Sequence, residues 1–257
     1  GSTAGFSLSR LGWMVLGLAA VVASAGVFNN LVDRRIDRKM NRTKNRPLAT
    51  GAVGVPAALV YGVCLALAGG LTLGLAVNGL SLGLAVAALL AYLGPYGFLK
   101  RRTVYGTLAG SLPGAVPPVI GYAAGSGRLD LTAGLLFLVM IIWQMPHFYA
   151  IAVYRYADYA AAGLPVWPLK KGLSNSRRQI MLFVAAYAAV APLLSLWTPL
   201  GAVYFFIMLP FGLWWLKTVL VTPPGERPAA WGKKIFRGSL IVLLGWCLAI
   251  ITDVFLP

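Results

Sequence analysis

Three polar side chains follow the first long apolar stretch of the chain at a spacing that could bind a metal ion. Asn29, Asp33 and Asp37 lie four residues apart, so in a helix they share one face over about 12 Å. Two carboxylates and an amide suit a hard cation. Mg²⁺ in particular is usually held by one or two carboxylates, while phosphate oxygens and water complete its octahedron. The spacing therefore predicts a metal site on a helix.

Basic side chains surround these carboxylates. Arginine matches phosphate oxygens with two parallel hydrogen bonds, so acids and bases together favour a metal-bridged diphosphate. The alternative is an ordinary inner loop, in which the Asp residues pair with neighbouring Arg residues and the basic run sets membrane orientation. The run comprises Arg34, Arg35, Arg38, Lys39, Arg42, Lys44 and Arg46.

A second polar group begins at Tyr154. Asp158 follows it by four residues, with Arg155 between them. If this helix emerges at the same membrane face as the first motif, its carboxylate and guanidinium approach the first metal site. A basic triplet at 100–102 is either an inner-loop anchor or a further group for phosphate oxygens.

His147 is the only histidine of the chain and lies about two helical turns before Tyr154. A neutral imidazole there could ligate a haem iron or act as an acid or base. The alternative is a structural histidine, because polar groups inside a membrane need hydrogen-bond partners. Its aromatic neighbours Trp143, Phe148 and Tyr149 could equally form an ordinary cluster at the membrane surface.

The composition excludes a water-soluble enzyme. Hydrophobic residues make up 59% of the 257 positions and charged residues 11%, against roughly 25% charged in a soluble domain. A membrane-spanning helix needs about 20 mostly apolar residues. The sequence therefore predicts an all-α, polytopic transmembrane bundle with eight helices, at about 11–29, 54–77, 80–98, 104–124, 132–154, 178–197, 200–221 and 235–256.

The net charge of +16 reports membrane topology rather than a nucleic-acid partner. All Lys and Arg residues except Arg10 and Arg128 lie in alternate connections, at 34–46, 100–102, 155–178 and 217–237. The positive-inside rule then places these four loops in the cytoplasm and the C-terminal Pro257 outside. We expect the chemistry on the cytoplasmic side of a lipid bilayer.

The expected span at 104–124 contains Pro113, Pro117 and Pro118. Proline inside a helix removes a hydrogen bond and clashes with the preceding turn, so a kinked or broken helix is expected. Such a backbone survives at membrane depth where it lines an interior space. The alternative is that its small residues permit close helix packing.

Four strings of residues, in this order, resemble the protohaem IX farnesyltransferases, or haem O synthases, of the UbiA-type intramembrane prenyltransferase superfamily. The resemblance covers most of the chain. The strings are VFNNLVDRRIDRKMNRTKNRPL at 27–48, KRRTVYGTLAGSLPGAVPPVIGY at 100–122, WQMPHFYAIAVYR at 143–155 and DYAAAGLPVWP at 158–168.

The resemblance implies one intramembrane prenyltransferase domain over 1–257, with nine helices around a central cavity open to the cytoplasm. Only eight helices are visible here, so the family's first helix is expected to be missing from this chain. Asn30 stands where many members carry Asp, and Tyr154 stands where quinone-type relatives carry Asp. These departures argue against a quinone or chlorophyll precursor as acceptor.

The implied reaction joins the farnesyl group of farnesyl diphosphate to a vinyl group of haem b, with addition of water, in the plasma membrane of a bacterium. A quinone-precursor prenyltransferase is the runner-up, and a transporter or haem-carrying membrane protein is the alternative from another class. A haem A synthase or terminal-oxidase assembly is the implied downstream partner. The implied roles are Mg²⁺ binding for Asn29, Asp33, Asp37 and Asp158, catalysis for these four and Tyr154, diphosphate binding for Arg38, Arg42, Lys44, Arg46, Lys100, Arg101 and Arg155, and haem binding for His147, Trp143 and Tyr149.

Overall fold

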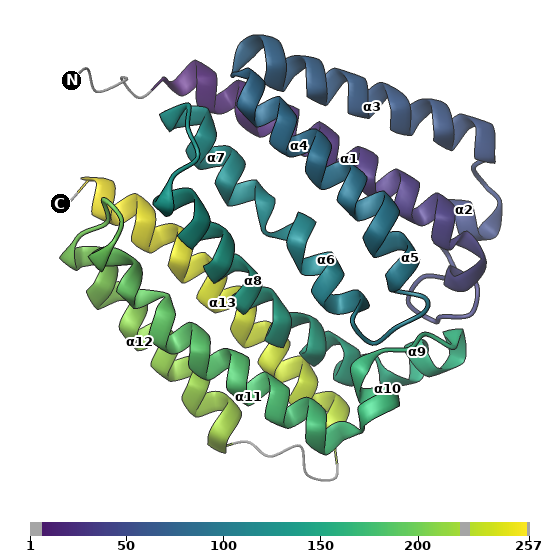
Figure 1. The fold of residues 1–257 in the computed structure, drawn as a ribbon. Coiled ribbons are helices and arrows are strands. Elements are labelled where there is room, and N and C mark those ends of the chain that lie inside the picture. The colour runs from purple at the N-terminus through teal and green to yellow at the C-terminus, as the bar shows by residue number, and fades with distance from the viewer. Residues whose placement is uncertain (1–6, 222–226, 256–257) are drawn as a thin grey trace. The chain divides into compact units, whose positions relative to one another are not determined.

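The computed structural model describes residues 7–221 and 227–255, and every regular element in these ranges is a helix (Figure 1). In chain order the elements are α1 (Leu8–Asp37), α2 (Pro47–Thr50), α3 (Val55–Ala76), α4 (Gly79–Ala91), the π-helix η1 (Tyr92–Tyr96), α5 (Gly97–Leu99), α6 (Gly106–Gly114), α7 (Val116–Ser126), α8 (Leu131–Tyr154), α9 (Tyr156–Ala162), α10 (Trp167–Lys171), α11 (Leu173–Val190), the 3₁₀-helix η2 (Pro192–Leu196), α12 (Ala202–Val221) and α13 (Pro228–Phe255).

Seven of the helices that the structure describes are long and apolar enough to cross a membrane. The remaining expected span, 104–124, forms two helices, α6 and α7, which are separated at Ala115. Pro117 and Pro118 lack a backbone N–H, so the last carbonyls of α6 lose their helical donors. The predicted all-helical membrane bundle and its broken span are both confirmed. Pro257, which was expected outside the cell, falls beyond the described residues.

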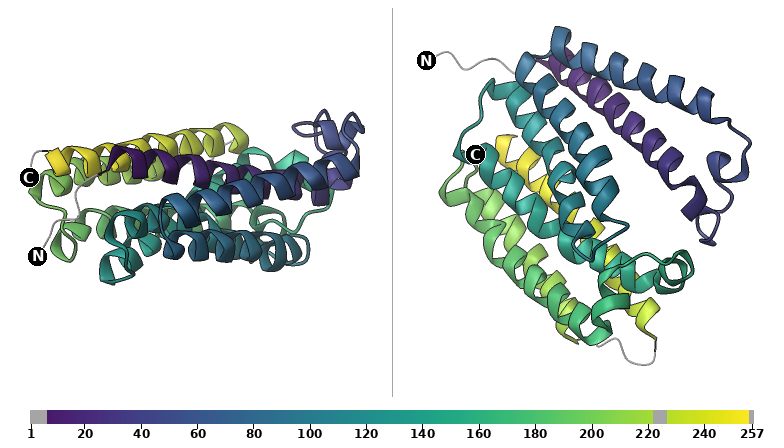
Figure 2. Two further views of the ribbon diagram at one scale, coloured as in Figure 1. Left: turned by 90° about the horizontal axis from the view of Figure 1, so that it is seen from above. Right: turned by 45° about the vertical axis from the view of Figure 1, so that its right-hand side comes forward.

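Two compact units divide the chain, Gly1–Ala133 with Ala157–Leu164 and Gly134–Tyr156 with Pro165–Pro257. In the first unit α1 and α3 lie side by side along most of their length (Figures 1 and 2). Their backbones approach closely because small residues meet at the contact. A Cβ atom on Gly69 would lie 2.6 Å from the carbonyl oxygen of Gly17.

Helices α4 and α7 complete the first unit around an apolar cluster. The side chain of Asn78 caps α4 by accepting the N–H of Ser81 at 2.8 Å, and its amide donates to the carbonyl of Ala123 in α7 at 3.0 Å. One buried residue from each of four helices meets in the cluster. These are Val21 of α1, Leu73 of α3, Ala85 of α4 and Ile120 of α7.

The turn between α7 and α8 carries an acid held by two donors. The hydroxyl of Tyr122 donates to Asp130 at 2.6 Å, and Arg128 pairs with the same carboxylate oxygen at 2.9 Å. The hydrogen bond from Tyr122 is the largest cause of a lowered pKa at Asp130. Within the first unit this turn follows the C-terminal end of α7, whereas the basic triplet at 100–102 precedes the start of α6.

The second unit contains most of α8 together with α10 to α13. Asp253, buried near the end of α13, accepts the backbone N–H groups of Gly201 and Tyr204 at 2.8 and 2.9 Å. It thereby caps α12, whose first N–H groups have no partner within the helix. The indole of Trp246 donates to the hydroxyl of Tyr204 at 3.0 Å, so α12 and α13 are joined at two levels.

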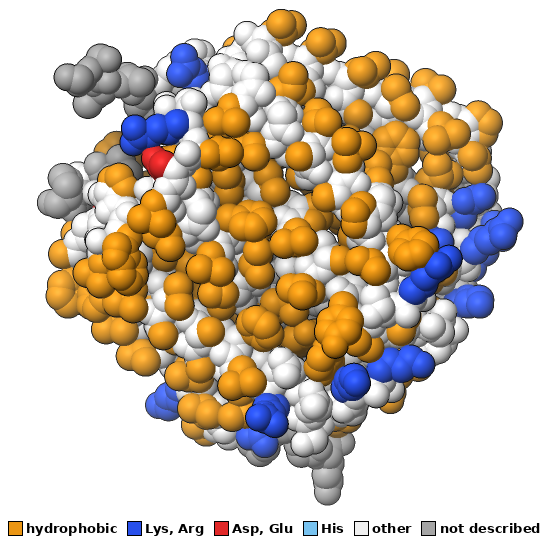
Figure 3. Space-filling model, in the orientation of Figure 1, with side chains coloured by type: hydrophobic (Ala, Val, Ile, Leu, Met, Phe, Trp, Pro, Cys, Tyr) orange, Lys and Arg blue, Asp and Glu red, His pale blue; other side chains and the backbone are white. Residues whose placement is uncertain are grey.

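Large apolar side chains remain exposed along the helices, as expected for surfaces that face lipid. Leu67, Leu71 and Leu75 of α3 are examples. On the face drawn in Figure 3, hydrophobic side chains cover the helices and Lys and Arg side chains gather at helix ends.

Candidate active site

The first motif forms its predicted helical face and meets the basic triplet. Asn29 and Asp33 lie on the last turns of α1. The ammonium of Lys100 donates to Asn29 Oδ1 at 2.5 Å and to Asp33 Oδ2 at 2.6 Å. Arg101 donates to the other oxygen of Asp33 at 2.7 Å. The structure therefore joins the motif to Lys100 and Arg101 in one polar site within the first unit.

The position of Lys100 depends on a close backbone approach. Lys100 follows α5, and the chain returns into α6 at Gly106. A Cβ atom on Gly106 would lie 2.5 Å from the Cα of Lys100. Because any other residue would push α6 away from Lys100, this glycine lets the ammonium reach α1.

Asp37 has a different partner from Asp33. Its carboxylate accepts the guanidinium of Arg46 at 3.0 Å, and its side chain is only 2% exposed. Thr43 donates to its backbone carbonyl, and Arg38 donates to the carbonyl of Ala49 at 2.6 Å. These bonds fold the segment 38–46 back onto the end of α1. In this arrangement Asp37, Arg38 and Arg46 hold the loop together.

Asp158 also contacts this loop, and the segment 157–164 that contains it belongs to the first unit. One of its carboxylate oxygens accepts the backbone N–H of Asn41 at 2.9 Å. Lys44 donates to the side chain of Asn41 at 3.1 Å, and the side chain of Arg42 is exposed. The second acid is thus brought to the first motif through the loop rather than directly to Asn29 and Asp33.

Tyr154 and Asp158 do not share one helix, contrary to the expectation from their spacing. α8 ends at Tyr154, and α9 begins after Arg155. In the second unit the ring of Tyr154 has the guanidinium of Arg155 at 4.3 Å from its centroid and the ammonium of Lys233 at 5.6 Å. The catalytic role predicted for Tyr154 and the diphosphate-binding role predicted for Arg155 stay predictions.

His147 lies among aromatic rings in the second unit. Trp143 stacks on it with centroids 4.8 Å apart. Its Nδ1 lies 2.7 Å from the hydroxyl of Ser239 on α13, and the indole of Trp143 donates to the carbonyl of Ser239 at 2.9 Å. Tyr149 contacts a different neighbour, Trp167, with centroids 5.6 Å apart. The structure thus places Trp143 against His147, and the ring of Tyr149 against Trp167.

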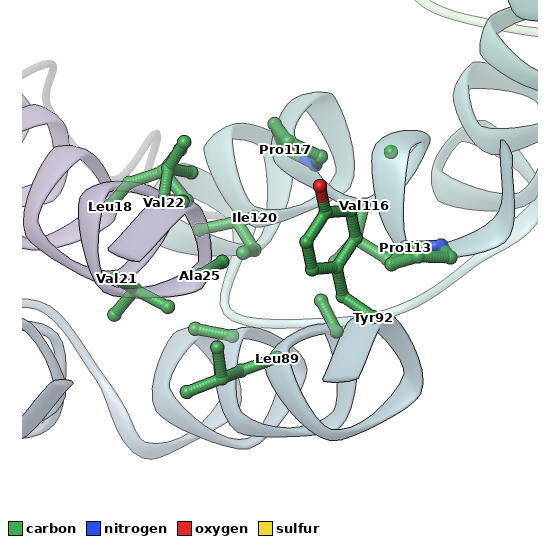
Figure 4. Close-up of a pocket in the computed structure, with 14 residues that line it drawn as sticks. Leu18, Val21, Val22, Ala25, Leu89, Tyr92, Pro113, Val116, Pro117 and Ile120 are labelled. Carbon is green, nitrogen blue, oxygen red and sulfur yellow. The ribbon is translucent and has the colours of Figure 1, made fainter. Parts of the chain in front are cut away.

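An apolar cavity of about 320 Å³ lies within the first unit and begins one helical turn from the polar site. On α1 it is lined from Leu18 to Gly26, on the same face that continues to Asn29. Figure 4 shows the ring of Tyr92, at the start of η1, extending toward Pro117. The broken span lines this cavity, which favours the interior interpretation of its prolines. Its lining residues are Leu18, Val21, Val22, Ala25, Gly26, Ala85, Ala88, Leu89, Tyr92, Pro113, Gly114, Val116, Pro117 and Ile120.

Two tyrosines connect the cavity with the polar site, and sequence reasoning missed them. The rings of Tyr92 and Tyr96 lie 5.0 Å apart, and the ammonium of Lys100 lies 5.1 Å from the centroid of Tyr96. The three residues are spaced by four, as are Asn29, Asp33 and Asp37. The same helical rule would therefore have found them. Ser239, by contrast, has no motif around it and depends on how α13 packs against α8.

The donor set at Asn29 and Asp33 fits a magnesium ion. Both oxygens point at one cation, the ammonium of Lys100. Among the described residues no three His, Cys, Asp or Glu side chains cluster as a metal site. Mg²⁺ is a metal that needs only one or two protein carboxylates when phosphate oxygens supply other ligands. The residues present therefore suit Mg²⁺ bound together with a phosphate ligand.

Comparison with known proteins identifies the family. A family model described as the UbiA prenyltransferase family matches residues 1–241. The chain belongs to the UbiA prenyltransferase family. Membership of this family and the long apolar helices make it an integral membrane protein and a prenyltransferase.

Curated members of the UbiA family are similar to this chain over most of its length. "Protoheme IX farnesyltransferase" of Klebsiella pneumoniae is 42% identical over 246 residues, which cover 95% of this chain and 83% of that protein. "Protoheme IX farnesyltransferase 2" of Chromobacterium violaceum is 44% identical over 231 residues, which cover 89% of this chain and 76% of the relative.

Solved UbiA structures share the fold. A UbiA homologue from Aeropyrum pernix K1 has a TM-score of 0.77 at 20% identity, covering 97% of this chain and 91% of that one. A homologue from Archaeoglobus fulgidus, whose structure is described as bound to GPP and Mg²⁺, has a TM-score of 0.73 at 18% identity, covering 96% and 90%. The expected fold class is confirmed.

Proposed function

We propose that this chain transfers the farnesyl group of farnesyl diphosphate to a vinyl group of haem b, with addition of water, giving haem O and diphosphate. The observation that carries the proposal is the polar site of Asn29, Asp33, Lys100 and Arg101 at the end of an apolar cavity. The names of the relatives support haem b as acceptor. The distribution of Lys and Arg supports an active site facing the cytoplasm, and the bacterial relatives support a bacterial membrane.

The polar site would bind the diphosphate. Lys100 and Arg101 supply ammonium and guanidinium donors for phosphate oxygens. Asn29 and Asp33 would hold Mg²⁺, and the description of the Archaeoglobus homologue supports this ion for the superfamily. When bound, Mg²⁺ supplies positive charge that stabilises the leaving diphosphate.

The loop 38–46 would complete this site. Asp37 and Asp158 fix the loop through Arg46 and the backbone of Asn41. The exposed guanidinium of Arg42 lies on this fixed loop and is free to approach phosphate oxygens. The loop acids would then contribute to catalysis by positioning cations, with Asp33 as the carboxylate that contacts the metal.

The cavity would hold the farnesyl chain away from water. The C1–O bond of farnesyl diphosphate breaks, and its electron pair leaves with the diphosphate. The π electrons of the haem vinyl group then form the new bond to C1. Water adds to the cation left on the vinyl group and releases a proton. Because Lys100 and Asp33 are only 14% and 15% exposed, charges at this position stabilise the leaving group more strongly than they would in water.

His147 is suited to contact the haem iron through Nε2. The hydroxyl of Ser239 donates to the carbonyl of Phe236 at 2.6 Å. That hydroxyl has one hydrogen, so it accepts at its contact with His147, which places the imidazole proton on Nδ1. Nε2 then carries the lone pair that an iron ligand needs.

Product analysis by mass spectrometry tests the proposal. The purified chain in nanodiscs is mixed with haem b, farnesyl diphosphate and Mg²⁺, with EDTA as control. A metal-dependent haem that has gained farnesyl plus water supports it. Unmodified haem together with prenylation of an added aromatic acid would move the assignment to quinone precursors. The resemblance further implies that haem O passes to a haem A synthase or to terminal-oxidase assembly.

The metal assignment has its own test. An Asp33→Asn variant that retains the fold should lose turnover at limiting Mg²⁺, because a carboxylate ligand is replaced by a neutral amide. Equal turnover of the variant and the wild type at limiting Mg²⁺ would refute the role of Asp33.

A further inference from the structure

The apolar cavity extends away from the polar site along three walls, formed by α1, by α4 with η1, and by α6 with α7. On α1 the cavity begins at Gly26, about one turn from Asn29, and its last lining residue is Leu18. Along α4 and η1 it begins at Tyr92, two turns before Lys100, and ends at Ala85. Both helices therefore lead from the polar site to the same far end.

The broken span runs along the cavity in the opposite direction. α6 starts beside Lys100, where Gly106 packs against the Lys100 backbone, and Gly110 packs against the ring of Tyr96. Pro113 lines the middle of the cavity, and Ile120 of α7 belongs to the buried cluster at the far end. Along α6 and α7, as along the other two walls, the residues therefore lead from the polar site to the far end of the cavity.

Apolar side chains line the far end of the cavity. Ile120 is 1% exposed. The buried cluster there has Met14, Leu18 and Leu82 packed against it. Met14 is the next residue of the α1 face beyond Leu18, yet it does not line the cavity. Leu18 and Ile120 therefore form its floor.

The distance from the polar site to the floor of the cavity matches one substrate class. Leu18 and Asn29 are separated by eleven positions, so at 1.5 Å per residue they lie about 16 Å apart along α1. This is close to the extended length of the three isoprene units in a farnesyl chain. A fourth unit would have to pass the floor.

We propose that Leu18, together with Ile120, limits the prenyl donor to farnesyl length. The proposal rests on the proposed function, since it assigns the cavity to the chain of the diphosphate substrate. Continuity with Lys100 and Asn29 favours this occupant over a lipid tail, because the polar site supplies cations for a diphosphate at the open end. Apolar residues at the far end discriminate by chain length, since one methylene too many in a close-fitting pocket costs about tenfold or more in kcat/KM.

Opposite substitutions at one floor residue provide the test. Leu18 is half-buried, and Leu18→Ala deepens the cavity whereas Leu18→Phe makes it shallower. We measure kcat/KM for geranyl, farnesyl and geranylgeranyl diphosphates with haem b. Leu18→Ala should raise the ratio of geranylgeranyl to farnesyl by about tenfold or more, and Leu18→Phe should raise the ratio of geranyl to farnesyl similarly. Leu16→Ala is the control, because Leu16 is on the same helix and 61% exposed.

The possible outcomes separate this inference from the proposed function. If the wild type forms no prenylated haem from any donor, the proposed function fails. If it forms haem O but both ratios in the Leu18 variants stay within twofold of the Leu16→Ala control, the inference alone is overturned. If Leu18→Ala does not fold, Leu18→Phe decides by the same criterion. Native mass spectrometry showing a lipid that farnesyl diphosphate cannot displace would also overturn it.

Discussion

Lys100→Met should tighten metal binding when no diphosphate is present. The ammonium of Lys100 contacts the oxygens of Asn29 and Asp33 that would hold Mg²⁺. A metal ion entering this site must displace it. Removing the ammonium therefore frees both oxygens, while methionine keeps the length and the apolar packing of the side chain.

The magnitude follows from the geometry of the pair. Lys100 and Asp33 are 14% and 15% exposed, so their contact lies between an exposed pair, worth about 0–1 kcal/mol, and a buried one. A hydrogen bond to a charged group contributes about 1.5–3 kcal/mol. Arg101 still holds the second oxygen of Asp33 at 2.7 Å, so we expect the loss of Lys100 to contribute about 1.5 kcal/mol, the lower end of this range. At about 1.4 kcal/mol per factor of ten, metal affinity should rise roughly tenfold.

The assay is Mn²⁺ or Mg²⁺ titration of the purified chain in nanodiscs by calorimetry, without prenyl donor. Lys39→Met is the matched control, because Lys39 is an exposed lysine six residues after Asp33 and its loss changes the net charge equally. With inorganic diphosphate as ligand the sign should reverse, since Lys100 then loses a phosphate contact. Metal affinity in Lys100→Met equal to that of wild type and control would refute the reasoning.

Three further substitutions test other parts of the structure. Gly69→Ala should lower stability by about 1–3 kcal/mol in thermal unfolding, because the added Cβ would lie 2.6 Å from a facing carbonyl. Gly70→Ala is the control, because a Cβ there would lie 3.4 Å from its nearest neighbour. Equal effects of the two substitutions would contradict this packing. Tyr122→Phe removes the bond that lowers the pKa of Asp130. That stabilisation exists above the usual pKa of 3.8 and is lost as pH falls through the lowered pKa. The melting-temperature gap to wild type should therefore narrow as pH falls below 3.8, and a gap that does not narrow there would contradict the reasoning. His147→Ala should change the absorption spectrum of bound haem, and an unaltered spectrum would exclude iron ligation.

Local periodicity predicts part of the candidate site. The face of Asn29 and Asp33 could be predicted because a helical repeat is a property of the sequence itself. The break near Pro117 could be predicted because proline acts on its own backbone. The partner of Asp37 could not, since Arg46 reaches it only after the loop 38–46 has folded back.

Relations between helices were beyond periodicity. The end of α8 at Tyr154, four residues before Asp158, follows no pattern in the sequence. Cavity depth depends on how α1, α4 and α7 pack together, so the role of Leu18 as its floor has no sequence signature. The contact of Ser239 with His147 likewise depends only on how α13 packs against α8.

The pairing of Lys100 with Asn29 and Asp33 has a consequence for how the protein is made. In many small metalloproteins, the free energy of metal binding is the free energy of folding, so the polypeptide collapses when the ion is withheld. Here the chain supplies its own counter-charge to the carboxylate. We therefore expect insertion into the bilayer and assembly of the helices to proceed without magnesium. Chelation should silence the enzyme reversibly and leave its abundance in the membrane unchanged.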